Sequence, residues 1–195
     1  MKKDIILAGV GGQGILSIAA IIGQAALNQN LHIKQAEVHG MSQRGGDVQS
    51  NLRICSEPIH SDLISLGRAD AIISLEPMEA LRYIPYLSPE GWIVVNSVPY
   101  INIPNYPEIE RLDAEFAKMP HVISFDVDAI AREHGGVRTV NMVLLGAASL
   151  ILDIEDTKLE EAIGDIFGRK GDKVVEMNVN AFRAGREAGK KQMKG

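Results

Sequence analysis

Near its start the chain reads Asp4-Ile-Ile-Leu-Ala-Gly-Val-Gly-Gly-Gln-Gly-Ile-Leu-Ser17, and this stretch decides the fold. Its first residues form an apolar run that is typical of a strand buried on both faces of a parallel sheet. A glycine-rich turn follows and leads directly into a segment of helical composition. A strand, a glycine loop and a helix in this order present backbone N–H groups and a helix N-terminus to an anionic group.

The glycines of this turn fit a known spacing, because Gly9, Gly11 and Gly14 match G-x-G-x-x-G. In a dinucleotide site the first two glycines permit a tight turn and close approach of a phosphate, and the third lets the helix pack on the strand. Glu37, 23 positions after Gly14, stands near where an acidic residue binds a ribose hydroxyl. The intervening Gly12-Gln13 pair is not required by that fingerprint. Two interpretations stay open: a dinucleotide site, and a turn that binds nothing.

A second polar loop, His39-Gly-Met-Ser-Gln-Arg-Gly-Gly-Asp47, follows the next predicted strand. Loops at the carboxyl ends of parallel strands carry ligand contacts in α/β proteins. Arg44 can offer a planar, charged fork to a phosphate or carboxylate, and Ser42 and Gln43 add neutral hydrogen-bonding groups. We interpret this loop as part of the binding site. The alternative is a surface turn with an incidental arginine.

Outward from these loops, predicted strands alternate with predicted helices over the first two-thirds of the chain. We expect strands over 5–8, 32–38, 48–54, 71–75, 92–96 and 122–125, and helices over 15–27, 76–83 and 128–134. The period-two alternation of 48–54 favours a strand covered on one face only and is compatible with an antiparallel strand. Residues 98–107, with three prolines and two tyrosines, predict an extended connection.

The last third of the chain is predicted to be helical. Residues 139–152 are apolar on nearly every side, so we expect a buried helix whose small central residues let a neighbour approach closely. Two amphipathic helices follow, around 159–167 and 173–184, and the basic residues after them predict a solvated, fraying tail. The whole pattern predicts an α/β fold with a mostly parallel sheet sandwiched by helices, Rossmann-like, with a helical C-terminal third. We expect one domain over 1–195.

The composition of the chain argues against several classes of function. The 195 residues are 46% hydrophobic and 23% charged, as in ordinary globular proteins, and the net charge of -5 argues against a nucleic-acid binder. Cys55 is the only cysteine, which excludes an intrachain disulfide and an iron–sulfur cluster held by this chain's own thiolates. No signal peptide is visible, and the longest apolar stretch is shorter than the roughly 20 residues that span a bilayer. We therefore expect a cytoplasmic protein without a membrane partner.

Catalytic and metal-binding motifs are missing from the sequence. The five histidines are scattered, and none has a cysteine or carboxylate at metal-ligand spacing. Neither a G-x-S-x-G nucleophile elbow nor a G-x-x-x-x-G-K-[ST] loop occurs. Glu76-Pro77 after a strand could face the site, although a carboxylate at a helix N-terminus is explained as well by the helix dipole. We expect no catalytic residue and no metal site in this chain.

Three segments together resemble the gamma-type domain of 2-oxoacid:ferredoxin oxidoreductases. They are Gly9-Val-Gly-Gly-Gln-Gly-Ile15, the stretch from Glu37 to Arg53 with its Ser-Gln-Arg-Gly-Gly core, and Asn141-Met-Val-Leu-Leu-Gly-Ala147. The similarity covers about residues 4–185 and is greatest to the stand-alone chains of the indolepyruvate branch of this family. The two glycine-rich loops in this order are specific to the family, whereas either loop alone is not.

The resemblance implies a complex that decarboxylates an aryl pyruvate with thiamine diphosphate, passes electrons through iron–sulfur clusters to ferredoxin and releases an acyl-coenzyme A. In this family the thiamine diphosphate and the clusters belong to a large partner subunit, so this chain would complete the complex, as part of an oligomer. It would also shape the coenzyme A or substrate side of the site.

The resemblance places binding in the two loops, at Gly9, Gly11, Gly12, Gln13, Gly14, Ser42, Gln43, Arg44 and Gly45. Two other hypotheses remain open at this point. One is a self-sufficient NAD(P)-dependent oxidoreductase, and the other is a nucleotide-binding adaptor with no role in catalysis.

Overall fold

The computed structural model describes residues 1–40 and 45–193, and its centre is a six-stranded sheet of order β2-β3-β1-β4-β5-β6. The strands are β1 (Lys2–Val10), β2 (His32–His39), β3 (Asp47–Cys55), β4 (Ala69–Ser74), β5 (Leu87–Asn96) and β6 (Val122–Phe125). The α-helices are α1 (Ile15–Leu27), α2 (Pro77–Arg82), α3 (Ile109–Phe116), α4 (Val127–His134), α5 (Val140–Ala148), α6 (Asp156–Phe167) and α7 (Asp172–Met193). Short 3-10 turns are η1 (Ile84–Tyr86), η2 (Val137–Thr139), η3 (Ser149–Ile151) and η4 (Gly168–Lys170).

The prediction of a mostly parallel α/β sheet is confirmed. β1, β4, β5 and β6 pair in parallel, while β3 is antiparallel to both of its neighbours. β3 is the strand whose period-two pattern was compatible with antiparallel pairing. It follows β2 after a short loop, so the two strands form a hairpin. In the sheet it is β3, and not β2, that pairs with β1, so β3 lies between the two.

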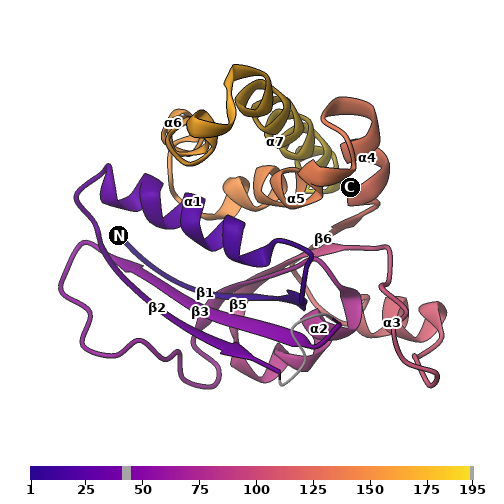
Figure 1. The fold of residues 1–195 in the computed structure, drawn as a ribbon. Coiled ribbons are helices and arrows are strands. Elements are labelled where there is room, and N and C mark those ends of the chain that lie inside the picture. Colours follow the sequence, from indigo (N-terminus) through magenta and orange to yellow (C-terminus); the bar gives the residue numbers. More distant parts are fainter. Residues whose placement is uncertain (41–44, 194–195) are drawn as a thin grey trace.

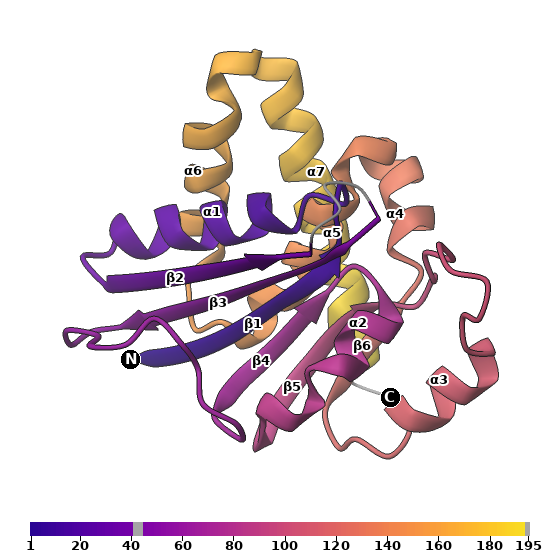
Figure 2. The same cartoon turned by 60° about the horizontal axis from the view of Figure 1, so that its bottom comes forward.

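Helices cover both faces of the sheet, as expected from the alternating strand and helix patterns. Figure 1 shows α1, α4, α5, α6 and α7 on one side and α2 and α3 on the other. Figure 2 brings the second side forward, with α2 across β4 and β5. β1 contributes to both cores, because Ile5 and Leu7 pack under the first layer and Ile6 and Ala8 under the second. This explains why its sequence is a continuous apolar run.

The helix predicted over 139–152 is buried, as expected, but it is shorter. It consists of α5, which ends at Ala148, followed by the 3-10 turn η3. Its small residues face α7, which crosses it at close range. A Cβ on Gly146 would lie 1.9 Å from the Phe182 carbonyl oxygen.

The prediction of a fraying basic tail is wrong up to Met193, because α7 continues as a helix to that residue, while Lys194 lies outside the described residues. Two of the basic residues pair with acidic residues of α6. Arg183 lies 2.6 Å from Glu160 and Arg186 lies 2.6 Å from Asp156. The tail is therefore ordered by contacts with a neighbouring helix, which composition does not reveal.

Other differences concern the polar middle of the chain. The sequence analysis did not predict α3, whose eight residues bury only Leu112 and Phe116. β5 starts at Leu87, before the predicted 92–96, because a register irregularity lets its first part continue beside β4. Within 1–40 and 45–193, no helix is long and apolar enough to cross a membrane.

Candidate functional site

The loop between β1 and α1 depends on glycine at two positions. Gly12 and Gly14 have φ angles of 103° and 85°, in the left-handed region that glycine adopts without strain. Gly14 also lies against α5, because a Cβ there would be 2.9 Å from Asn141 Nδ2. The sequence predicted that Gly14 lets α1 pack on β1, but the close contact that needs a glycine here is with α5. The Asn141 amide in turn donates to the Gly14 carbonyl at 3.2 Å.

Gly9 and Gln13 have internal roles that the sequence did not suggest. Gly9 belongs to β1 rather than to the turn, and a Cβ there would lie 3.0 Å from Gln13 Oε1. That oxygen accepts a hydrogen bond from the Val10 N–H at 2.8 Å, and Gln13 Nε2 donates to the Leu75 carbonyl at 3.2 Å. Gln13 therefore braces the loop against the end of β4, and this predicted binding residue also lines a cavity beside the loop.

The second glycine-rich loop meets the first, as its position after β2 predicted. The Gly11 N–H donates to the Gly46 carbonyl at 2.8 Å, and the Gly45 N–H donates to the Gly11 carbonyl at 3.4 Å. Gly11 and Gly45 are thus in direct contact. The remaining predicted residues of this loop, Ser42, Gln43 and Arg44, lie outside the described residues.

A third segment, residues 97–107, lies beside the two loops. Nothing in the sequence indicated that this segment belongs to the site. Asn102 Nδ2 donates to the Gly45 carbonyl at 2.7 Å. The segment is held on its other side by Glu76, whose carboxylate accepts from the Tyr106 hydroxyl and from the Tyr100 N–H at 3.4 Å. The only sequence signal here was the carboxylate of Glu76 directly after a strand.

Glu76 is itself buried at the start of α2. Its side chain caps the helix by accepting from the Glu79 N–H at 2.8 Å. Burial raises the pKa of Glu76, while the hydrogen bonds from Tyr106, Glu79 and Tyr100 partly offset that rise. Burial, followed by the bond to Glu76, also raises the pKa of Tyr106. Both groups therefore keep their protons to a higher pH than exposed side chains of the same types.

A cavity of about 770 Å³ lies beyond the carboxyl ends of β1, β4 and β5, and Gly12, Gly14 and Tyr100 are among the residues that line it. Residues 12–14 and the starts of α5 and α7 line it. Two exposed cations, Arg138 and Lys170, line it. The size is that of a ligand pocket, and a glycine loop with nearby cations suits a phosphate-bearing ligand. Other lining residues include Leu75, Asn96, Tyr100, Asp128, Asn141 and Asn178.

Arg138 and Lys170 carried no signal in the sequence. Both are basic residues near helix boundaries, Lys170 directly after Arg169, and only the fold brings them to the glycine loop. Asn141 is different, because it belongs to one of the segments that carry the family resemblance.

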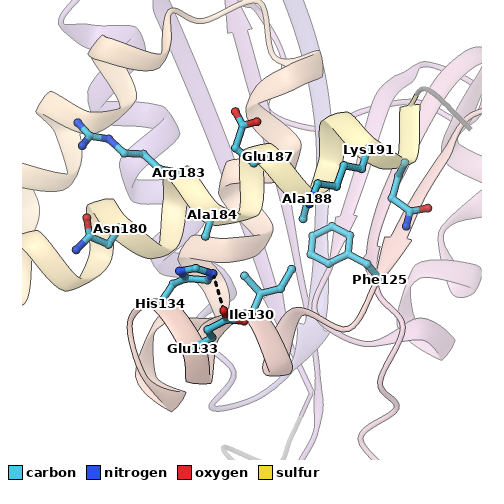
Figure 3. A pocket seen from close by; sticks show the side chains of 11 residues that line it. Phe125, Ile130, Glu133, His134, Asn180, Arg183, Ala184, Glu187, Ala188 and Lys191 are labelled. Atoms are coloured by element: carbon cyan, nitrogen blue, oxygen red, sulfur yellow. Dashed lines mark ion pairs between the residues drawn. The ribbon is translucent and has the colours of Figure 1, made fainter.

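A second cavity of about 830 Å³ lies farther along α7, where that helix meets α4 (Figure 3). Figure 3 shows Phe125 and Ile130 among charged side chains, with His134 Nε2 3.8 Å from Glu133 Oε1. Arg183 at this cavity is already paired with Glu160. Helix surfaces line most of it and no glycine loop reaches it, so we place the functional site at the first cavity.

The structure disfavours Glu37 as a ribose ligand. Glu37 lies on β2, and β3 separates that strand from β1. Its carboxylate accepts from Gln35 Nε2 at 2.6 Å and lies 3.3 Å from His39 Nε2. In a dinucleotide-binding unit the acidic residue ends the strand next to β1, so the predicted geometry is not formed.

The chain is similar to known proteins over nearly its whole length. Residues 4–188 match the family described as pyruvate ferredoxin/flavodoxin oxidoreductase. The chain is 32% identical to indolepyruvate oxidoreductase subunit IorB of Methanothermobacter thermautotrophicus, over 95% of this chain and 96% of that protein. It is 36% identical to the subunit of the same name from Archaeoglobus fulgidus, over 95% of this chain and 94% of that one.

Two solved structures share the fold. One is the 2-oxoglutarate:ferredoxin oxidoreductase from Magnetococcus marinus with 2-oxoglutarate, coenzyme A and succinyl-CoA bound. It matches all of this chain with a TM-score of 0.77 and 24% identity, and this chain spans 32% of that longer one. The other is the keto/oxoacid ferredoxin oxidoreductase gamma subunit from Geobacter sulfurreducens, with a TM-score of 0.71 and 24% identity over 97% of this chain and 99% of that one.

Proposed function

The chain belongs to the pyruvate ferredoxin/flavodoxin oxidoreductase family, and from this premise we propose that it is the small subunit of an enzyme that oxidatively decarboxylates an aryl pyruvate, such as indolepyruvate, to an acyl-coenzyme A. The observation that carries the proposal is similarity over nearly the full length of relatives named as indolepyruvate oxidoreductase subunits. The chain is thus a subunit of a 2-oxoacid:ferredoxin oxidoreductase. Neither a self-sufficient NAD(P)-dependent enzyme nor a non-catalytic adaptor is favoured.

We assign the thiamine diphosphate and the iron–sulfur clusters to a larger partner subunit, which passes the electrons to ferredoxin. The single cysteine of the sequence supports this assignment, because such clusters need several protein ligands. In the described part of the chain, no group of three or more histidine, cysteine or acidic side chains could hold a metal ion. The small subunit would then contribute binding and shape rather than redox chemistry.

The role that we propose for this chain is to bind coenzyme A as a substrate of the complex. Coenzyme A carries phosphate groups, and the cavity at the glycine loop before α1 is lined by Gly12 and Gly14 together with Arg138 and Lys170. Arg44 of the second loop supplies a further cation from the sequence. No residue is assigned a proton-transfer role.

We further propose that residues 1–195 form one gamma-type domain, that the chain works in the cytoplasm and that it associates into an oligomer with the large subunit. The family match over 4–188 supports the first of these. Obligate interfaces commonly bury more than about 2,000 Å², so the complex should survive size-exclusion chromatography.

The test is reconstitution with a large subunit of this enzyme family that carries the thiamine diphosphate and cluster sites. The isolated small subunit should be colourless and inactive, whereas the complex should reduce ferredoxin when given an aryl pyruvate and coenzyme A. Arg138→Ala and Lys170→Ala should each raise the KM for coenzyme A, by about tenfold for a lost charge-assisted bond. Steady-state kinetics with varied coenzyme A measure this.

The matched control is Arg169→Ala, which removes an exposed cation from the turn that contains Lys170 but not from the cavity wall. Its KM for coenzyme A should stay unchanged. Aryl-pyruvate turnover by the isolated chain would contradict the subunit assignment. An unchanged KM in both cavity variants would contradict the assignment of coenzyme A to this cavity.

A further inference from the structure

The carboxylate of Glu76 has a role that helix capping alone does not require. Its side chain is 1% exposed, and it accepts hydrogen bonds from two elements at once. One donor is the Glu79 N–H of α2, which is the usual capping bond. The others, the Tyr106 hydroxyl and the Tyr100 N–H, both come from the segment 97–107.

Two further contacts hold this segment at its start. The Ser97 N–H donates to the Phe125 carbonyl at 2.9 Å, and the Val98 N–H donates to Asn96 Oδ1 at 3.2 Å. Within the described residues, 98–107 contain neither helix nor strand. The apolar side chains of the segment are not buried, since Ile101 is 67% exposed and Tyr100 is 49% exposed. A chain without secondary structure and without a buried core depends on its few hydrogen bonds for a fixed position.

The segment contributes to the cavity and also contacts the second glycine loop. Tyr100 lines the cavity beside the glycine loop. Asn102 donates to the Gly45 carbonyl, and the Gly45 N–H donates to the Gly11 carbonyl. An unbroken series of contacts therefore leads from Glu76, through the segment, to the second glycine loop and on to the first.

We propose that Glu76 is a positioning residue for coenzyme A, because it holds the segment 97–107 and through it fixes Tyr100 and the base of the second glycine loop. The inference rests on the proposed binding of coenzyme A in this cavity. Glu76 does not touch the ligand. When its bond to Tyr106 is removed, the segment spends less time in the binding position, and the apparent affinity for coenzyme A falls by that fraction.

The sharpest variant is Tyr106→Phe in the reconstituted complex, because it removes the hydroxyl and leaves the α2 cap intact. We expect the KM for coenzyme A to rise about tenfold, as for one lost hydrogen bond to a charged group. The kcat and the KM for the 2-oxoacid should stay within about twofold. Tyr86→Phe, at the end of η1 and outside the segment, is the matched control and should change none of these values.

Two further variants test the same series of contacts. Asn102→Ala cuts the link to Gly45 and should show the same rise in KM. In the double variant Tyr106→Phe/Asn102→Ala, the KM for coenzyme A should rise by less than the product of the two single increases, because both changes interrupt the same series of contacts. Glu76→Gln should recover most of the affinity lost in Glu76→Ala, since its amide can still cap α2 and pair with the Tyr106 hydroxyl.

A readout independent of coenzyme A is cleavage by chymotrypsin after Tyr100. Tyr106→Phe should accelerate this cleavage in the full-length chain, while Tyr86→Phe should not. Faster cleavage with an unchanged KM, in a complex where Arg138→Ala does raise the KM, would overturn the positioning role and leave the proposed function standing. A joint failure of Arg138→Ala, Lys170→Ala and Tyr106→Phe to change the KM would overturn both. A lowered melting temperature with kcat and both KM values altered would show that the bond is merely structural.

Discussion

At the scale of single residues, the polar side chains of the site divide into those that hold the backbone and those that remain for a ligand. Gln13 and Glu76 use their polar atoms to fix loops. Arg138 and Lys170 are exposed on the cavity wall and can meet an anion. The sequence ranks these residues differently, because a polar group in a glycine-rich loop indicates a binding site more strongly than a basic residue at a helix end.

Arg44 leads to a prediction at this scale. Arg44→Ala in the reconstituted complex should keep its melting temperature and its partner binding, because the sequence predicts a polar loop here and changes in such loops usually cost within about 0.5 kcal/mol. Turnover that depends on coenzyme A should fall at least about tenfold, since a charge-assisted bond contributes roughly 1.5–3 kcal/mol. Arg44→Lys should recover only part of the loss, because a point charge does not reproduce a planar fork. Melting curves and steady-state kinetics measure the two effects.

Arg68→Ala is the control, since it removes an exposed arginine at the amino end of β4, away from the loops. It should change neither stability nor kinetics. Early melting of Arg44→Ala with intact kinetics would mean that this arginine is structural.

At the scale of elements, α5 and α7 pack so closely that each needs a glycine at the contact. Among the glycines described, an added Cβ would come nearest to another atom here. A Cβ on Gly146 would lie 1.9 Å from the Phe182 carbonyl oxygen, and one on Gly185 would lie 1.9 Å from that of Val143. The two helix backbones therefore touch. This contact places the start of α5, with Asn141, beside the glycine loop.

Gly146→Ala and Gly185→Ala should each lower the free energy of unfolding by about 3 kcal/mol, because an added methyl must separate the two helices. Denaturant unfolding of the purified chain measures the change. Gly164→Ala in α6 is the matched control, since its added Cβ would meet no atom within 4 Å. Alanine is also the better helix former by up to about 1 kcal/mol, so this variant should be as stable as the parent or more so. Equal stability of all three variants would show that α5 and α7 can separate without cost.

At the scale of the whole molecule, an ion pair ties the first strand to its neighbour across the sheet. Buried Asp4 of β1 lies 2.7 Å from Arg53 Nε of β3 and 2.8 Å from Lys2 Nζ. Arg53 also donates to the carbonyls of Ser61 and Leu63, so the connection after β3 is held by the same group. Burial by itself raises the pKa of Asp4, but the hydrogen bonds and charges of Arg53 and Lys2 outweigh it and hold the pKa below 3.8.

Because the pKa of Asp4 is lower in the folded chain than in the unfolded chain, its ionised form stabilises the fold above the unfolded value. That contribution is lost as the pH falls through the lowered folded value. Asp4→Asn should therefore reduce the free energy of unfolding by about 1–3 kcal/mol at neutral pH. The difference from the parent should shrink as the pH falls below 3.8. Urea unfolding across this pH range measures it.

Asp153→Asn is the control for this prediction. Its carboxylate pairs with Lys3 at 2.9 Å but is 67% exposed, so its loss should cost less than about 1 kcal/mol at any pH. A loss at Asp4 that did not depend on pH would mean that packing, not charge, stabilises this position.

The sequence by itself determined the elements whose causes are local. The helix predicted over 15–27 has the same bounds as α1, and the apolar run before it lies in β1. The turn between them needs glycine because of its own φ angles, which is a property of the residue and not of its neighbours. The period-two pattern of residues 48–54 was likewise compatible with the antiparallel strand that β3 forms.

Only the tertiary structure decided which of these pieces meet at the site. The insertion of β3 between β1 and β2 removes Glu37 from the position that its spacing suggested. Glu76 reaches Tyr106, and Gly14 reaches Asn141, across separations of 30 and 127 residues. No local pattern encodes such contacts, because they depend on how the helices and strands pack around the sheet. The physical reason is that periodicity reports which face of an element is buried, but not which element covers it.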